Sequence, residues 1–138
     1  MPLPPLLADW PRPVQLFLVG LLPASFGFLC GGVLGGSGAA FLALQVVAAG
    51  GGYFAGLEHA RPRSGTLRGV WGGLVFGGFI LVGHHAIGGA DHHLLPDPEL
   101  LQIVIAAGVG SLLGTLGART RARYSPTTRD PAPSSRIR

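Results

Sequence analysis

Residues Val14 to Leu57 form a run of 44 positions without a charged side chain. As a single helix this run would be roughly 66 Å long, about twice the thickness of the hydrocarbon core of a bilayer. We therefore expect it to fold back on itself as two membrane-spanning helices. Two further apolar stretches, 67–87 and 99–118, are each long enough to cross a bilayer once. The sequence predicts an all-α integral membrane protein built as a four-helix transmembrane bundle.

The composition supports this fold class. Charged residues make up 12% of the 138 residues, whereas soluble domains have about 25%. The mean hydropathy is +0.48, and many of the 24 glycines lie inside the apolar stretches. A small soluble domain needs more charge to cover its large surface, and collagen or a flexible linker would not place glycine in this way.

The expected organisation has three parts. Residues 1–13 form a cytoplasmic flank, residues 14–118 form the transmembrane domain, and residues 119–138 form a basic, disordered cytoplasmic tail rich in Pro and Ser. We expect the first span to be retained, because a Pro-rich flank precedes it and no small-residue cleavage site follows. Pro23 should kink that span, and Ser37 should cap the start of the next one. The four spans are predicted at 14–34, 37–57, 67–87 and 99–118.

The arginines indicate the orientation. The chain has ten arginines and no lysine: one before the first span, three between the second and third spans, and six after the fourth. The other two connectors have none, so the positive-inside rule places both termini in the cytoplasm. The strong bias to Gly, Ala, Pro and Arg suggests a GC-rich bacterium and hence its inner membrane. Six arginines near the predicted span ends are expected to set topology and to contact anionic lipid headgroups: Arg61, Arg63, Arg68, Arg119, Arg121 and Arg123. Because topology accounts for these charges, we expect no nucleic-acid partner despite the pI of about 10.6.

Small residues recur at four-residue spacing in every predicted span. This spacing places them on one helix face, where they let helix backbones approach closely in lipid. One interpretation is packing within the bundle, and the alternative is that some of these faces build a homo-oligomer or join a larger membrane complex. The candidate packing residues are Gly27, Gly31, Gly35, Gly52, Gly56, Gly69, Gly73, Gly77, Gly110 and Gly114.

No predicted span has a charged residue at its middle. Ion-coupled transporters, proton-translocating rings and voltage sensors place such a residue at membrane depth, so these classes are disfavoured. The first interpretation of function is therefore a non-enzymatic structural or accessory membrane component without a cofactor.

Four of the five histidines lie in the stretch GHHAIGGADHHLL, residues 83–95. A zinc or copper site needs three or four ligands that converge at about 2.0–2.2 Å from the ion. The alternative function is therefore divalent-metal binding or transport at the extracytoplasmic surface. The competing interpretation is that the histidines bind no metal and are simply tolerated at the interface between membrane and water. The candidate ligands are His85, Asp91, His92 and His93.

A third alternative comes from the stretch GGSGAAFLAL, residues 35–44. It resembles the GxSG motif at the nucleophile of rhomboid intramembrane proteases. The resemblance covers about ten residues and implies Ser37 as a nucleophile, with His84 or His85 on the same membrane side as its partner. Rhomboid proteases have six spans and a histidine deep inside a helix, and this chain departs from both features. An intramembrane serine hydrolase is thus the third hypothesis for the function.

Overall fold

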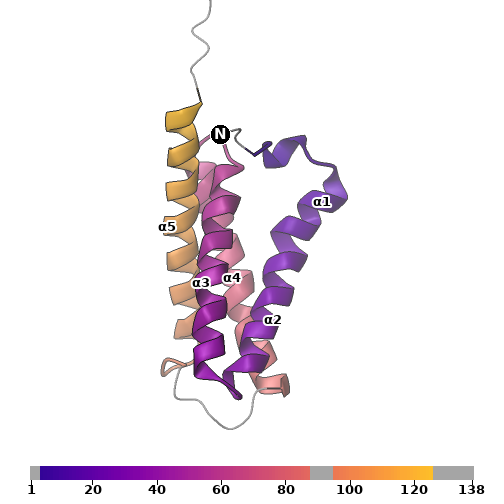
Figure 1. The fold of residues 1–138 in the computed structure, drawn as a ribbon, viewed down its shortest axis with the longest axis vertical. Coiled ribbons are helices and arrows are strands. Elements are labelled where there is room, and N and C mark those ends of the chain that lie inside the picture. The colour runs from indigo at the N-terminus through magenta and orange to yellow at the C-terminus, as the bar shows by residue number, and fades with distance from the viewer. Residues whose placement is uncertain (1–3, 88–94, 126–138) are drawn as a thin grey trace, which may run out of the picture.

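The computed structural model describes residues 4–87 and 95–125. These residues form helices and no strand, and four of the helical segments are long and apolar enough to cross a membrane. The predictions of an all-α chain and of four long apolar segments are therefore confirmed for this part of the protein. Figure 1 shows the long helices running side by side, with neighbours in sequence pointing in opposite directions.

The first long segment, Arg12–Leu34, has three parts. After a short helix η1 (Leu7–Asp9), the chain forms α1 (Arg12–Leu16), the π-helical turn η2 (Phe17–Leu21) and α2 (Leu22–Leu34). In the π turn the Leu22 N–H donates to the Phe17 carbonyl. In the same register the Leu18 carbonyl would need the N–H of Pro23, which proline lacks. Figure 1 shows α1 and η2 leaning away from α3.

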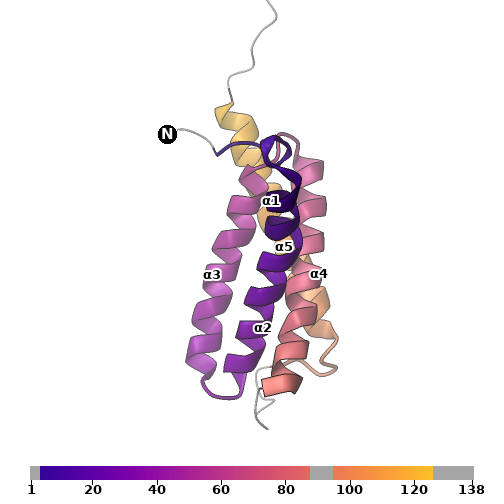
Figure 2. The same ribbon diagram turned by 90° about the vertical axis from the view of Figure 1, so that its right-hand side faces the viewer.

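The second segment, α3 (Gly38–Leu57), follows after a tight turn. The N–H groups of Gly36 and Ser37 both donate to the Val33 carbonyl at 3.0 Å, which closes the end of α2. The Ser37 side chain then accepts from the Ala40 N–H at 3.3 Å, so Ser37 caps α3 as the sequence predicts. This turn joins α2 and α3 at one end of the bundle (Figure 2).

The last two helices are both longer than the predicted spans. α4 (Pro62–Ile87) begins five residues before the predicted start at residue 67, because Pro62 is well suited to the first turn of a helix. α5 (Leu101–Tyr124) continues six residues past the predicted end at residue 118, so residues 119–124 are helical and do not belong to a disordered tail. The predicted boundary followed the first charge, but arginines are good helix formers. The helix ends where Pro126 disfavours helical geometry at Ser125.

Glycine contacts define the order of the helices. On α4, Gly69 and Gly73 lie against the α5 backbone at Gly110 and Ala106. Nearer its C-terminal end α4 meets α2, where Gly31 lies against the Ile80 carbonyl. α3 meets α5 near Gly114. α4 is therefore central, with α2 and α5 beside it, and α3 lies on α5 (Figures 1 and 2).

The two ends of the bundle differ in chemistry. The arginine end holds the N-terminal segment, the connection between α3 and α4, and the last turns of α5. The opposite end, called the histidine end here, holds the turn between α2 and α3 and the last turn of α4. Near the histidine end lies an apolar core cluster of Cys30, Leu34, Phe41 and Ile80.

Candidate functional site

A cavity lies between α3 and α4 in the described part of the chain. It has a volume of about 690 Å³ and is lined by side chains from α2, α3, α4 and α5. Ligand-binding pockets commonly have volumes of about 300–1,000 Å³, so the cavity is large enough for a small organic molecule. Its lining is mostly apolar, with Glu58, Arg68, Gln45 and Gln102 as the polar exceptions.

The cavity exists because α3 is held at its two ends and stands away from α4 between them. At the arginine end, Gly56 of α3 and Gly65 of α4 both approach the Gly114 carbonyl of α5, and this contact draws three helices together. At the histidine end, Phe41 is 4% exposed and belongs to the apolar core cluster. A backbone contact at one end and a buried side chain at the other thus hold α3 in place and leave the middle open.

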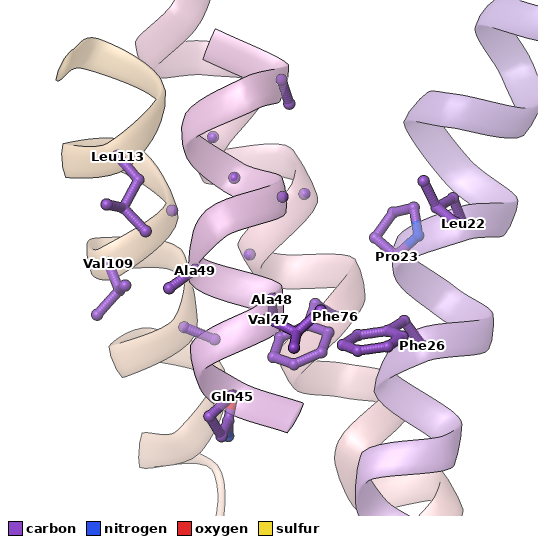
Figure 3. Close-up of a pocket in the computed structure, with 18 of the residues that line it drawn as sticks. Leu22, Pro23, Phe26, Gln45, Val47, Ala48, Ala49, Phe76, Val109 and Leu113 are labelled. Carbon is purple, nitrogen blue, oxygen red and sulfur yellow. The ribbon is translucent and has the colours of Figure 1, made fainter. Parts of the chain in front are cut away.

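Figure 3 shows the side chains around the middle of the cavity. Pro23 and Phe26 project from α2 toward α3, and Phe26 lies beside Phe76 of α4. The two rings are stacked, with centroids 6.2 Å apart and planes inclined by 22°. Ala48 of α3 lines the same cavity, so a small side chain and two aromatic rings share its wall.

Two charged residues, Glu58 and Arg68, line the cavity toward the arginine end. Glu58 follows α3 as its C-cap, and Arg68 lies two turns inside α4. Arg68 Nη2 donates to the Leu18 carbonyl, the acceptor that Pro23 leaves without a helical donor. Glu58 Oε2 and Arg68 Nε are both buried without a hydrogen-bond partner among residues 4–87 and 95–125. The charged end of the cavity therefore offers one unused acceptor and one unused donor.

Burial changes the acidity of Glu58. Desolvation raises the pKa of its carboxyl above the ordinary value of 4.5, while the positive charges of Arg68 and His59 partly oppose this shift. Within the described residues the one ion pair is His85 with Glu99, so Glu58 and Arg68 attract each other without direct contact. Both residues line the cavity, so a polar group inside it can approach either of them.

Arg121 organises the arginine end on the other side of α3. Its Nη1 donates to the Pro4 carbonyl at 2.6 Å and to the Leu57 carbonyl at 2.7 Å. The Leu7 N–H donates to the Glu58 carbonyl at 3.1 Å, so the N-terminal segment lies across the end of α3. These contacts fix the position of Glu58.

The six arginines that the sequence assigned to topology and lipid headgroups therefore divide into two groups. Arg61, Arg63, Arg119 and Arg123 are exposed at the arginine end, where a headgroup contact remains a prediction. Arg68 and Arg121 are instead partly buried and satisfy backbone carbonyls inside the protein. The early start of α4 explains the difference for Arg68, because it moves this residue from a helix end to two turns inside the helix.

The candidate packing glycines lie in three kinds of place. A Cβ on Gly27, Gly31, Gly56, Gly69, Gly73 or Gly77 would fall closer than 3.0 Å to an atom of a neighbouring helix, and Gly110 and Gly114 meet Gly69 and Gly65 in the same way. Gly52 has ordinary contact with Leu113 at 3.7 Å, and Gly35 is the C-cap of α2. The sequence analysis missed three equally close positions, Gly65, Gly83 and Gly117. Gly65 lies four residues before Gly69 and Gly117 three residues after Gly114, so the spacing could have identified both.

The histidine stretch is only partly described. Asp91, His92 and His93 lie outside the described residues, so the convergence of the four predicted ligands stays a prediction. His85 Nε2 lies 2.9 Å from Glu99 Oε2, a carboxylate that the predicted ligand set did not include. Within residues 4–87 and 95–125, no group of three or more His, Cys, Asp or Glu side chains is arranged to hold a metal ion.

His84 differs from the expectation of a solvated interfacial imidazole. It is 1% exposed and lies with its ring centroid 5.6 Å from that of His85. The close approach of α2 and α4 causes this burial, since Gly31 lies against the His84 backbone and Gly83 against the Phe28 carbonyl. Glycine packing thus encloses a polar side chain that the sequence places at a span end.

Glu58 and the cavity itself were not identified from the sequence as a site. The sequence shows Glu58 beside three arginines in a short loop, a pattern typical of a solvated connector. Contacts of Glu58 with the N-terminal segment, more than 40 residues away in the chain, do not show in the local pattern. The comparisons give no further guidance: no protein-family model, no curated protein and no solved structure matches this chain.

Proposed function

We propose that the protein is a four-span integral component of a bacterial inner membrane, with both termini in the cytoplasm. The observation that carries this proposal is the surface of the four long helices. Large apolar side chains point outward all along them, with Leu16 and Val46 73% exposed and Phe54 65% exposed. In water such a surface would drive aggregation, whereas in a bilayer it is the expected boundary with lipid.

The charge distribution supports the proposed orientation. The arginines of the described part, from Arg12 to Arg123, lie at one end of the bundle, and Glu99 lies at the other with His85. Positive charge gathered on one side is the pattern of a cytoplasmic face. The lipid bilayer is thus the first partner that we propose.

We further propose a non-enzymatic role, as a structural or accessory component rather than a hydrolase. In support of this, Ser37, the nucleophile implied by the rhomboid resemblance, uses its hydroxyl oxygen to accept the hydrogen bond that caps α3.

We also propose a second copy of the chain or a larger complex as a partner. Outward helix faces on which it can lie are left by glycines without a neighbour within 4 Å, among them Gly50, Gly78 and Gly108.

Topology fusions test the first proposal. A reporter fused after Arg61 or within the C-terminal tail should give a cytoplasmic signal, and one fused after Asp91 should give an extracytoplasmic signal. The protein should also stay in the membrane fraction after extraction at alkaline pH. A cytoplasmic signal at Asp91, or release by alkaline extraction, would contradict the four-span arrangement.

Metal binding at the histidine end is the second candidate. The observation in its favour is the pair of His85 with Glu99, which brings two ligand-type side chains together. The other candidate ligands, Asp91, His92 and His93, lie outside the described residues. Purified protein should then carry stoichiometric zinc or copper, and His85→Ala should remove it. Metal-free protein whose melting temperature does not respond to added zinc would rule this candidate out.

A further inference from the structure

The cavity between α3 and α4 combines a long apolar body with one charged end. Phe41 and Glu58, which line it near its two ends, are 17 residues apart on the same helix. At 1.5 Å per residue this separation is roughly 25 Å, close to the thickness of a bilayer hydrocarbon core of about 30 Å. A chain molecule that lies parallel to α3 therefore fits the shape of the cavity.

The charged end sets the chemistry of the group that can lie there. Glu58 offers a buried carboxylate oxygen and Arg68 a buried Nε–H, and neither has a partner in the described part of the chain. Unpaired buried polar groups are costly, so a ligand that satisfies both is favoured. An anionic head would face repulsion from Glu58, and a purely apolar molecule would leave both groups unsatisfied. A head with a cationic N–H donor and an anionic acceptor satisfies both.

We propose that this cavity binds a zwitterionic phospholipid of the phosphoethanolamine type. Its ammonium group contacts Glu58, its phosphate contacts Arg68, and one acyl chain lies in the apolar space beside Phe26, Ala48 and Phe76. The proposal rests on the proposed membrane location, because the bilayer is the source of the ligand. Arg68 already bonds the Leu18 carbonyl through Nη2, so its unpartnered Nε–H is held in a fixed direction for the phosphate.

Lipid retention by the purified full-length chain tests the proposal. The protein is reconstituted in nanodiscs made from equal parts of phosphatidylethanolamine and phosphatidylglycerol, then released into mild detergent, and the retained lipid is identified by mass spectrometry. We expect about one phosphatidylethanolamine per chain. Glu58→Gln should lower its retention over phosphatidylglycerol about tenfold, the effect expected when the acceptor of a hydrogen bond from an ammonium group loses its charge.

A matched pair of variants separates binding in the cavity from general lipid adhesion. Ala48→Leu fills the cavity and should lower retention of phosphatidylethanolamine about tenfold, whereas Ala43→Leu, an exposed position on the same helix outside the cavity lining, should leave it unchanged. Equal retention of both lipids by the parent, or equal behaviour of the two variants, would overturn the proposal. If the chain retains no lipid but still resists alkaline extraction, the lipid site fails while the membrane location stands.

Discussion

The α4–α5 pair and the α3–α4 pair are arranged in opposite ways. α4 and α5 meet along a seam of glycines, where Gly69, Gly73 and Gly77 lie directly against the α5 backbone. α3 and α4 instead stand apart, and the space between them is the cavity of about 690 Å³. Both pairs are built from apolar, glycine-rich sequence, so composition alone does not distinguish them.

The difference comes from where the glycines face. Each close glycine on the seam replaces a side chain with a backbone contact, so α4 and α5 leave no room for a ligand between them. On α3, Gly56 makes such a contact near the arginine end, but Gly50 and Gly51 have no neighbouring atom within 4 Å. A glycine therefore brings helices together only where another backbone faces it. The same residue type leaves open space elsewhere.

The largest expected effect comes from breaking the seam. In Gly73→Leu the new Cβ would lie 2.6 Å from the Ala107 Cα, and the backbone there has nowhere to move without separating the helices. We expect a loss of about 3 kcal/mol or more in the free energy of unfolding, at the upper end of overpacking effects. Thermal unfolding in detergent, followed by circular dichroism, measures this loss.

Gly78→Leu is the matched control for that measurement. It lies on the same helix, but a Cβ there has no neighbour within 4 Å. It should melt within a few degrees of the parent. If Gly73→Leu and Gly78→Leu melt alike, the α4–α5 seam is not the part that stabilises the bundle.

A smaller effect is expected where α3 is tied at the arginine end. Arg121→Met keeps the length of the side chain but removes the hydrogen bonds to the Pro4 and Leu57 carbonyls. We expect a loss of about 2 kcal/mol, because hydrogen bonds from a charged donor exceed those between neutral groups. Arg123→Met, at an exposed position on the same helix, should change the melting temperature little. Equal melting of these two variants would mean that α3 does not depend on this contact.

Much of this fold can be predicted from the sequence. The run from Val14 to Leu57 is too long for one crossing, and the spacing of Gly69, Gly73 and Gly77 indicates a close-packed face. The cap at Ser37 follows from the GGSG turn, as the structure bears out. These features depend on neighbours in sequence, whose chemistry is local.

The candidate site could not be predicted in the same way. Glu58 and Arg68 are assigned to a solvated loop when they are seen only beside other charges. Their roles appear once the π turn before Pro23 leaves the Leu18 carbonyl free and α4 carries Arg68 toward it. His84 shows the same limit, since its burial depends on two glycines in different helices. Contacts across the bundle, rather than local pattern, determine these three environments.

At the other end of α3, Ser37→Ala should have a moderate effect. The substitution removes the hydrogen bond that the Ala40 N–H donates to Ser37 Oγ at 3.3 Å. Loss of an N-cap costs about 1 kcal/mol, whereas glycine at the same position costs only a few tenths. The melting temperatures of Ser37→Ala and Ser37→Gly therefore test whether the residue acts as a cap. A larger loss in Ser37→Gly than in Ser37→Ala would contradict that role.

The smallest expected effect concerns the carboxyl group of Glu58, which lines the cavity between α3 and α4. Burial raises the pKa of Glu58, so the folded state holds this proton more tightly than the unfolded state does. The resulting stabilisation is complete below the ordinary value of 4.5 and is lost as the pH rises through the folded-state pKa. Since Glu58 is only partly buried, water screens it, and we expect a contribution below about 1 kcal/mol.

The measurement is the difference in melting temperature between the parent and Glu58→Gln from pH 4 to pH 8, which cancels the titration of the histidines common to both. Relative to the variant, the parent should lose stability as the pH rises, because only the parent must ionise a carboxyl beside the apolar cavity. A difference that does not change with pH would mean that water reaches Glu58 freely and that the cavity has no desolvated charged end.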